Sequence, residues 1–342
     1  MKINLMTSEP KIQESVTAIR QMLSDARRVL IVSHVRPDGD AIGSMLGLGQ
    51  ALSEAGKQVK PVLADGVPLP LRYMPGSKAV ERSISEEELA QTDLVIVVDC
   101  ADQHRIGLAL GDRPPDLNID HHATNPNFAR VNLVIPEQAA TCAIIASHLE
   151  EWGLAFNQEI ASHLLTGIIT DTIGFRTSNT TPEILRLAAG LMEHGANLPD
   201  LYMRALTNKS FEAARYWGMG LYKVQLVELN GRGSYVWTTL TLADRKEAKY
   251  PGNDDADLVN LLSSIETDMA VLFIEQKNNR VKVSWRARPG IDVSKIALQF
   301  GGGGHPSAAG ADITGSLETV QEQVLEASQT MLAMTLQDKN NP

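Results

Sequence analysis

Short apolar runs, each followed by a turn and a helical pattern, constrain the fold of this chain most strongly. Arg28 to Ser33 reads RVLIVS and ends in a cluster of Pro, Gly and Asp residues, after which Ala41 to Ala55 has the pattern of a helix. Asp93 to Val98 reads DLVIVV, and Leu117 to Ile119 is the end of a third run. Continuous apolar strands between helices are typical of a parallel sheet covered on both faces. We therefore expect an α/β fold with a parallel sheet in the N-terminal half.

The second half of the chain has a different pattern, which predicts a smaller mixed α/β unit. The expected strands are Val224 to Leu229, Ser234 to Thr241, Met269 to Gln276 and Arg280 to Arg286. The expected helices are Asp255 to Ile265 and Ser316 to Met334. The residues KNNR at 277–280 would form a hairpin turn. With 342 residues, the chain is long enough for two domains of about 150 residues each. We predict domains at 15–190 and 216–335, joined by a helical linker at 191–215.

Composition excludes several classes of protein. Lys and Arg total 31 against 41 Asp and Glu, a net charge of −10, whereas a protein that coats nucleic acid is expected to be basic. Apolar runs such as Leu94 to Val98 are far shorter than the ~20 residues that span a bilayer. Met1 to Pro10 lacks the pattern of a secretory signal, and two cysteines fit a reducing compartment. We expect a cytoplasmic protein without a membrane partner.

Acidic residues and histidines gather just after the apolar runs. The segment His34 to Asp40 follows the first run, Asp99 the second, and Asp120-His121-His122 the third. Asp171 follows the apolar run Leu164 to Thr170. Because the carboxyl ends of parallel strands meet at one crevice, we expect these side chains to lie together. Carboxylates so close would repel one another, unless metal ions hold them.

The types of side chain indicate which metal these residues would bind. Imidazole and carboxylate ligands without thiolate favour Mn²⁺ or a similar divalent ion over a structural Zn²⁺. Two ions about 3.5–4 Å apart fit the number of ligands better than one, with Asp99 as the bridge between them. Each motif alone is most often a turn or a helix cap, and Cys100 is expected to be a small buried hydrophobe. The prediction rests on their combination.

These motifs resemble the four-motif signature of the DHH phosphoesterase superfamily, and a glycine run resembles its associated C-terminal domain. The matching segments are HVRPDGDAIGS at 34–44, DCADQHRIG at 99–107, IDHHATN at 119–125, GIITDT at 167–172, and GGGGH at 301–305 with AAG at 308–310. The resemblance covers about residues 15 to 335 and is strongest to the nanoRNase/pAp-phosphatase branch. It implies an N-terminal parallel-sheet DHH domain and a smaller mixed α/β DHH-associated domain.

Carried over by position, the resemblance implies a role for each residue of the site. The implied metal ligands are His34, Asp38, Asp40, Asp99, His121 and Asp171. They would hold two Mn²⁺ ions, with Mg²⁺ or Co²⁺ as substitutes. His122 would contact the scissile phosphate as a catalytic residue with Asp99, and Asp120 would orient a histidine ring. Arg105 would contact phosphate, although a surface arginine is nearly as good an interpretation.

The glycine run at 301–304 lies between an apolar segment and AAGA, which indicates a folded unit rather than a flexible linker. Backbone N–H groups of glycines approach phosphate closely and form anion-binding nests. Residues 271–310 also carry six basic side chains against Glu275 and Asp292. The glycines that would contact the substrate in this way are Gly302, Gly303 and Gly304. The resemblance implies that Arg286 and His305 hold the phosphate and the sugar or base of the nucleotide.

The function that follows is hydrolysis of short oligoribonucleotides and 3′-phosphoadenosine 5′-phosphate (pAp), by hydroxide formed between two metal ions. A phosphodiesterase for cyclic di-AMP, pApA or pGpG stays open as the alternative. The GGGGH segment and Arg286 argue against an inorganic pyrophosphatase, and the complete ligand set argues against a non-catalytic nucleotide sensor. The resemblance also implies a homodimer.

Overall fold

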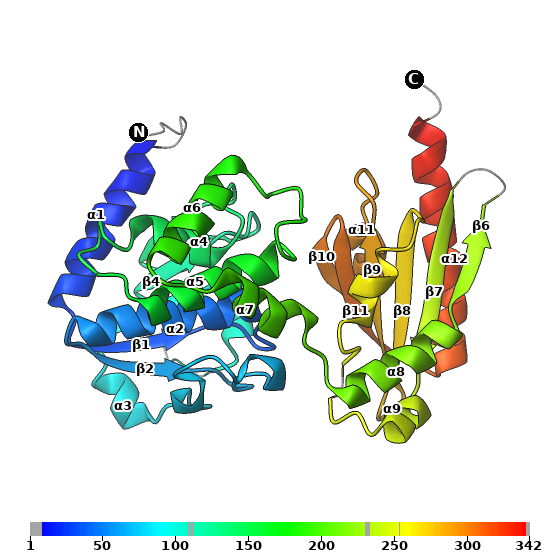
Figure 1. Ribbon diagram of the computed structural model, residues 1–342, viewed down its shortest axis with the longest axis horizontal. Helices are drawn as coiled ribbons and strands as arrows, with labels where there is room; N and C mark the ends of the chain where they lie inside the picture. The colour runs from blue at the N-terminus through cyan, green and yellow to red at the C-terminus, as the bar shows by residue number, and fades with distance from the viewer. Residues whose placement is uncertain (1–8, 109, 111–112, 230–232, 253, 340–342) are drawn as a thin grey trace. The chain divides into compact units, whose positions relative to one another are not determined.

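The computed structural model (Figure 1) describes residues 9–108, 110, 113–229, 233–252 and 254–339. The expectation that the chain has no secretory signal rests on Met1 to Pro10, and residues 1–8 of that segment lie outside the described residues. The chain divides into two compact units, Met1–Asn208 and Lys209–Pro342. The division falls inside the segment predicted as a helical linker, and the predicted domain bounds themselves stay a prediction. Each unit is described by itself.

The first unit is built on a parallel sheet of five strands, in the order β2-β1-β3-β4-β5. Its strands are β1 (Arg28–Val32), β2 (Gln58–Val62), β3 (Leu94–Val98), β4 (Leu117–Asp120) and β5 (Val131–Val134). The parallel sheet confirms the predicted α/β class. The two strands that the sequence did not reveal, β2 and β5, are the edges of the sheet. Edge strands bury fewer residues, so their apolar runs are weaker than those of β1 and β3.

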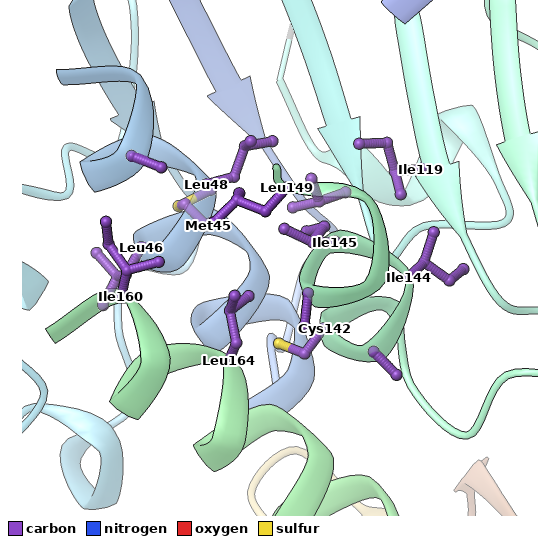
Figure 2. Packing of buried hydrophobic residues seen from close by; sticks show 14 of the residues in the cluster. Met45, Leu46, Leu48, Ile119, Cys142, Ile144, Ile145, Leu149, Ile160 and Leu164 are labelled. Atoms are coloured by element: carbon purple, nitrogen blue, oxygen red, sulfur yellow. The ribbon is translucent and has the colours of Figure 1, made fainter. Parts of the chain in front are cut away.

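Helices cover the sheet of the first unit. They are α1 (Glu9–Asp25), α2 (Gly39–Glu54), α3 (Glu86–Ala90), α4 (Thr141–His148), α5 (Gln158–Asp171), α6 (Pro182–Glu193) and α7 (Leu198–Tyr202). Alternate strand residues face opposite ways: Val29 and Ile31 pack with α2, α4 and α5, whereas Leu30 and Val32 pack on the other face. Figure 2 shows side chains of α2, α4 and α5 meeting in the first of these cores.

Helix α5 packs against α2 at a distance that requires glycine. A Cβ atom on Gly43 of α2 would lie 2.6 Å from the carbonyl oxygen of His163 in α5. One on Gly167 of α5 would lie 2.2 Å from the Sγ atom of Cys142 and 2.8 Å from Oδ1 of Asp40. Such distances are too short for any side chain, so these glycines set how closely the two helices approach.

Replacing Gly167 by alanine is therefore expected to lower the free energy of unfolding by about 1–3 kcal/mol, the usual cost of overpacking. Gly190 of α6 is the matched control, because a Cβ atom there would have no heavy atom within 4 Å among those compared. Gly190→Ala should instead stabilise the protein by up to about 1 kcal/mol, since alanine favours the helix. Urea denaturation of both variants measures the difference. Equal effects of the two substitutions would contradict the close packing of α5 on α2 and α4 at this position.

The second unit contains a mixed sheet of six strands in the order β10-β11-β9-β8-β7-β6, in which β7 and β8 are parallel and the other pairs antiparallel. The strands are β6 (Gln225–Glu228), β7 (Ser234–Leu240), β8 (Met269–Gln276), β9 (Arg280–Ala287), β10 (Gly303–His305) and β11 (Ala308–Thr314). Its helices are α8 (Phe211–Tyr222), α9 (Leu242–Ala248), α10 (Leu258–Leu262), α11 (Ser294–Gln299) and α12 (Leu317–Lys339). The mixed α/β class predicted for this half is confirmed.

In two turns of the second unit, residues with left-handed φ angles determine where the neighbouring strands and helix begin or end. The predicted hairpin joins β8 to β9, and Asn278 and Asn279 adopt left-handed φ angles of 60° and 53°, which asparagine tolerates well. Helix α10 is shorter than predicted, because Ala256 and Asp257 are also left-handed and delay its start until Leu258.

The glycine run ends in strand β10 at the edge of the second sheet, where Gly303 to His305 pair with β11. Gly304 is required there, since its φ angle is 142° and a Cβ atom would lie 2.5 Å from the carbonyl oxygen of Ala308. The run is thus part of a folded sheet and not a flexible linker. As an edge strand, β10 has a side that pairs with no other strand of the described sheet.

Candidate active site

Seven histidine and aspartate side chains of the first unit meet where β1, β3 and β4 end. Their potential ligand atoms form three groups, and within each group all atoms lie within 4.8 Å of one another. The groups are His34, Asp38 and Asp99; Asp40, His121 and Asp171; and Asp99, His121 and His122. The structure thus brings together all the side chains that the sequence predicts as metal ligands. His122 lies in the same cluster.

Asp99 lies between two histidines. Its Oδ2 atom is 3.6 Å from Nε2 of His34, and its Oδ1 atom is 3.7 Å from Nε2 of His121. Although burial opposes ionisation, the contact with His34 and the charges of the neighbouring histidines lower the pKa of Asp99 to about 2. Asp99 also has a left-handed φ angle of 52°, a strained conformation that is common at functional sites. Its two oxygens therefore face different groups of ligands, as a bridging carboxylate requires.

Both of these histidines are oriented by backbone carbonyl groups. The Nδ1 atom of His34 is 2.9 Å from the carbonyl oxygen of Val35, and that of His121 is 3.3 Å from the carbonyl oxygen of Gln138. For His121, a proton on Nδ1 leaves Nε2 as the atom with a free lone pair. The Nε2 atom of His121 lies 3.5 Å from Oδ2 of Asp171. This is the arrangement of histidines that bind metal ions in proteins.

Asp40 and Asp171 come to the site on helices. Asp40, in the first turn of α2, accepts hydrogen bonds from the backbone N–H groups of Thr141 (2.6 Å) and Cys142 (2.9 Å). Asp171 is the last residue of α5, so the apolar run before it is a helix and not a strand. The close packing of α5 on α2 brings its carboxylate to Asp40 and His121.

The raised pKa values of Asp40 and Asp171 indicate that this cluster can hold a cation. Burial, and then the charge of Asp99, raise the pKa of Asp40 well above its usual range. Partial burial, and then the charge of Asp40, do the same for Asp171. Carboxylates in this arrangement ionise together only when a cation compensates their charge. The donor set, imidazole and carboxylate with no thiolate, fits divalent ions such as Mn²⁺ or Mg²⁺.

His122 is held by a chain of hydrogen bonds. Its Nδ1 atom donates to Oδ1 of the buried Asp120 (2.7 Å), whose Oδ2 atom accepts from Nδ2 of Asn125 (2.6 Å). Burial lowers the pKa of His122, but the hydrogen bond to Asp120 and the charge of Asp99 outweigh it and raise the pKa to about 9. Without metal ions, this ring therefore carries a proton at neutral pH.

Sequence reasoning missed three residues that shape the site. Asn125 lies in the IDHHATN segment, which was the signal that could have revealed it. Gly167 is the first residue of the GIITDT segment, which was likewise its signal. Thr141, whose hydroxyl donates to Oδ1 of Asp99 (3.1 Å), has no such signal, because nothing in the local pattern marks a threonine at a helix start as part of a site.

The other predicted residues lie at the edge of this cluster or in the second unit. Nη2 of Arg105 is 3.1 Å from Nδ1 of His34, so this exposed arginine borders the cluster. In the second unit, Arg286 of β9 donates through Nε to Oδ1 of Asn260 (3.3 Å) and through Nη1 to the carbonyl oxygen of Trp285 (3.0 Å). Burial lowers the pKa of Arg286. Gly302 precedes β10, and Gly303, Gly304 and His305 form it.

Comparison with known proteins identifies the family. The model of the DHH family, N-terminal domain, matches residues 28–168, and that of the DHHA1 domain matches residues 238–334. A Thermus thermophilus protein named bifunctional oligoribonuclease and PAP phosphatase NrnA is 36% identical over 321 residues, which cover 93% of this chain and 95% of that protein. The chain belongs to the DHH phosphoesterase family. As a member, it is a hydrolase of phosphoester bonds.

Two further matches cover most of this DHH protein. A Bacillus subtilis protein with the same NrnA name is 28% identical, covering 83% of this chain and 89% of that protein. The solved structure of an exopolyphosphatase-related protein from Bacteroides fragilis superposes with a TM-score of 0.85 at 27% identity, covering 94% of this chain and 98% of that one. Among the described residues, no helix of the DHH protein is both long and apolar enough to cross a membrane.

Proposed function

We propose that this DHH hydrolase is a Mn²⁺-dependent phosphoesterase that cleaves short oligoribonucleotides and pAp. The observation that carries the proposal is Asp99, whose two oxygens face two separate groups of ligand atoms. The names of the Thermus thermophilus and Bacillus subtilis relatives, oligoribonuclease and PAP phosphatase, support the substrate class. Mn²⁺ is favoured by the mixed imidazole and carboxylate donors.

The proposed ligands of the two ions are the group of His34 and Asp38 and the group of Asp40, His121 and Asp171, with Asp99 common to both ions. One ion would be held by His34, Asp38 and Asp99, and the other by Asp40, Asp99, His121 and Asp171. If bound there, two such ions would supply an activated water and would neutralise charge on the phosphoryl oxygens. Mg²⁺ and Co²⁺ are the expected substitutes.

His122 would supply the proton for the leaving oxygen. The Nδ1 hydrogen bond to Asp120 fixes the ring, and the proton on Nε2 is the one that general acid catalysis would use. Asp120 and Asn125 act through His122 and contact no substrate in this mechanism. Arg105, beside His34, would hold a non-bridging phosphate oxygen.

The second unit would bind the remote part of the substrate. Among the described residues, the Nη2 atom of Arg286 has no hydrogen-bond partner, while Asn260 and Trp285 fix the rest of the guanidinium group. The charges of Asp255 and Asp257 act on this largely buried cation, and its spare donor would bind a further anion such as a substrate phosphate. Edge strand β10, with Gly303, Gly304 and His305, would contact the sugar or base.

Arg286→Ala is expected to raise KM about 10- to 100-fold with little change in kcat, because a hydrogen bond to a charged group contributes about 1.5–3 kcal/mol. Arg280→Ala is the matched control on the same strand, since its side chain is exposed and its pairing with Asp312 at 3.6 Å contributes little. Steady-state kinetics on pAp measure both constants. A fall in kcat with KM unchanged would place Arg286 in the chemical step and contradict the proposal.

A product assay with Mn²⁺ tests the proposed function directly. The substrates to compare side by side are pAp, RNA of two to five nucleotides, cyclic di-AMP, linear pApA and pGpG, and pyrophosphate. Turnover of pAp and short RNA is expected to exceed that of the others. Preferred cleavage of a cyclic or linear dinucleotide would establish the alternative phosphodiesterase function, and binding without turnover would indicate a sensor.

We also propose that the protein acts in the cytoplasm and as a homodimer. The two cysteines, Cys100 and Cys142, are free and buried, which fits a reducing compartment. Sedimentation equilibrium of the purified protein tests the dimer, and a monomer at micromolar concentration would contradict it.

A further inference from the structure

Thr141, the first residue of α4, contacts two acidic residues of the site at once. Its hydroxyl group donates to Oδ1 of Asp99 (3.1 Å), and its backbone N–H group donates to Oδ2 of Asp40 (2.6 Å). The residue is fully buried, with 0% of its surface exposed. We propose that Thr141 is a positioning residue that sets the affinity of one of the two metal sites. This inference rests on the proposed function, since it requires metal ions to bind.

The contacts of Thr141 are confined to one side of the cluster. Oδ1 of Asp99 and Oδ2 of Asp40 are the oxygens that face Nε2 of His121, at 3.7 and 4.0 Å. The other oxygen of Asp99 faces His34 instead. Thr141 therefore orients the oxygens available to the ion of the Asp40, His121 and Asp171 group, and none of those that are specific to the other group.

The hydroxyl group of Thr141 has no competing role in the fold. Helix α4 is preceded by Ala140, which gives no side-chain cap, and the Thr141 hydroxyl caps nothing itself. In the part of the chain that the structure describes, Asp99 is its one hydrogen-bond partner. Groups that orient metal ligands typically change metal affinity about 10- to 100-fold when they are removed.

The test is titration of the metal-free protein with Mn²⁺ by isothermal calorimetry. Thr141→Val keeps the shape and the backbone N–H group but removes the hydroxyl, whereas Thr141→Ser keeps the hydroxyl. In Thr141→Val, one of the two sites is expected to weaken about 10- to 100-fold while the other changes little. Thr141→Ser should bind both ions as the wild type does.

Thr166→Val is the matched control for removal of a buried hydroxyl. Thr166, 1% exposed, donates to the carbonyl oxygen of Ser162 within α5 and contacts no residue of the cluster through its hydroxyl. It should leave both Mn²⁺ affinities unchanged. Urea denaturation of all metal-free variants separates a change in affinity from a loss of folding.

Three results would overturn the proposal. Unchanged affinities in Thr141→Val, with two ions bound to the wild type, would remove the role of Thr141 and leave the proposed function intact. Equal weakening of both sites in Thr141→Val and Thr141→Ser would indicate a general packing role. A wild-type protein that binds no Mn²⁺ at all would instead overturn the proposed function, and the role of Thr141 with it.

Discussion

Asp99→Asn is expected to reduce Mn²⁺-dependent hydrolysis about 10³-fold or more, because a bound metal ion stabilises transition-state charge by several kcal/mol and about 1.4 kcal/mol corresponds to a factor of ten. The carboxylate faces both groups of ligand atoms, so its neutralisation affects both ions. Asparagine is the better substitution than alanine, since it tolerates the left-handed φ angle of 52° at this position. Asp99→Ala should abolish activity as well, with added backbone strain.

Steady-state hydrolysis of pAp with Mn²⁺, together with calorimetric Mn²⁺ titration, measures the effect of Asp99→Asn. Asp102→Asn is the control, because Asp102 lies in the same loop and its Oδ1 atom accepts a hydrogen bond from the N–H group of His104, a role that asparagine retains. Wild-type activity in Asp99→Asn with Mn²⁺ present would sink the assignment of the site.

His122→Ala is expected to lower kcat about 10²- to 10⁴-fold, the usual contribution of general acid–base catalysis. Both Mn²⁺ affinities should change little, because His122, although it lies in one of the groups that contain Asp99, is not among the proposed ligands of either ion. This separation of turnover from metal binding distinguishes His122→Ala from Asp99→Asn. Asn125→Ala should lower kcat less, since it loosens Asp120 and leaves the imidazole in place.

His148→Ala is the control for loss of a histidine paired with an acid. The Nδ1 atom of His148 lies 2.9 Å from Oε2 of Glu151, at the end of α4 away from the cluster. Its removal should leave kcat and KM unchanged. If His122→Ala loses Mn²⁺ affinity in proportion to its activity, then His122 is a metal ligand and not the proton donor.

Strands β1 and β3 were predicted correctly because a buried parallel strand reads as a continuous apolar run, such as VLIV or LVIVV. The acids and histidines that follow them could be assigned to one cluster for a geometric reason, since parallel strands end at a common edge. Asp171 illustrates the limit of this reasoning. Asp171 does lie in the cluster, as its place after an apolar run predicted, but that run is helix α5 and not a strand. Because α5 is buried on nearly all sides, its sequence lacks the alternation of apolar and polar faces that reveals a helix.

By itself, the sequence determined which side chains are candidates to bind metal and phosphate, because that chemistry depends on residue type and on short spacings along the chain. Only the tertiary structure decided what holds those side chains in place. Thr141 contacts Asp99 across 42 positions and Asp40 across 101, and Gly167 is needed because Cys142 and Asp40 lie against it. Contacts between distant segments depend on how closely helices and strands pack, and no local periodicity encodes that distance.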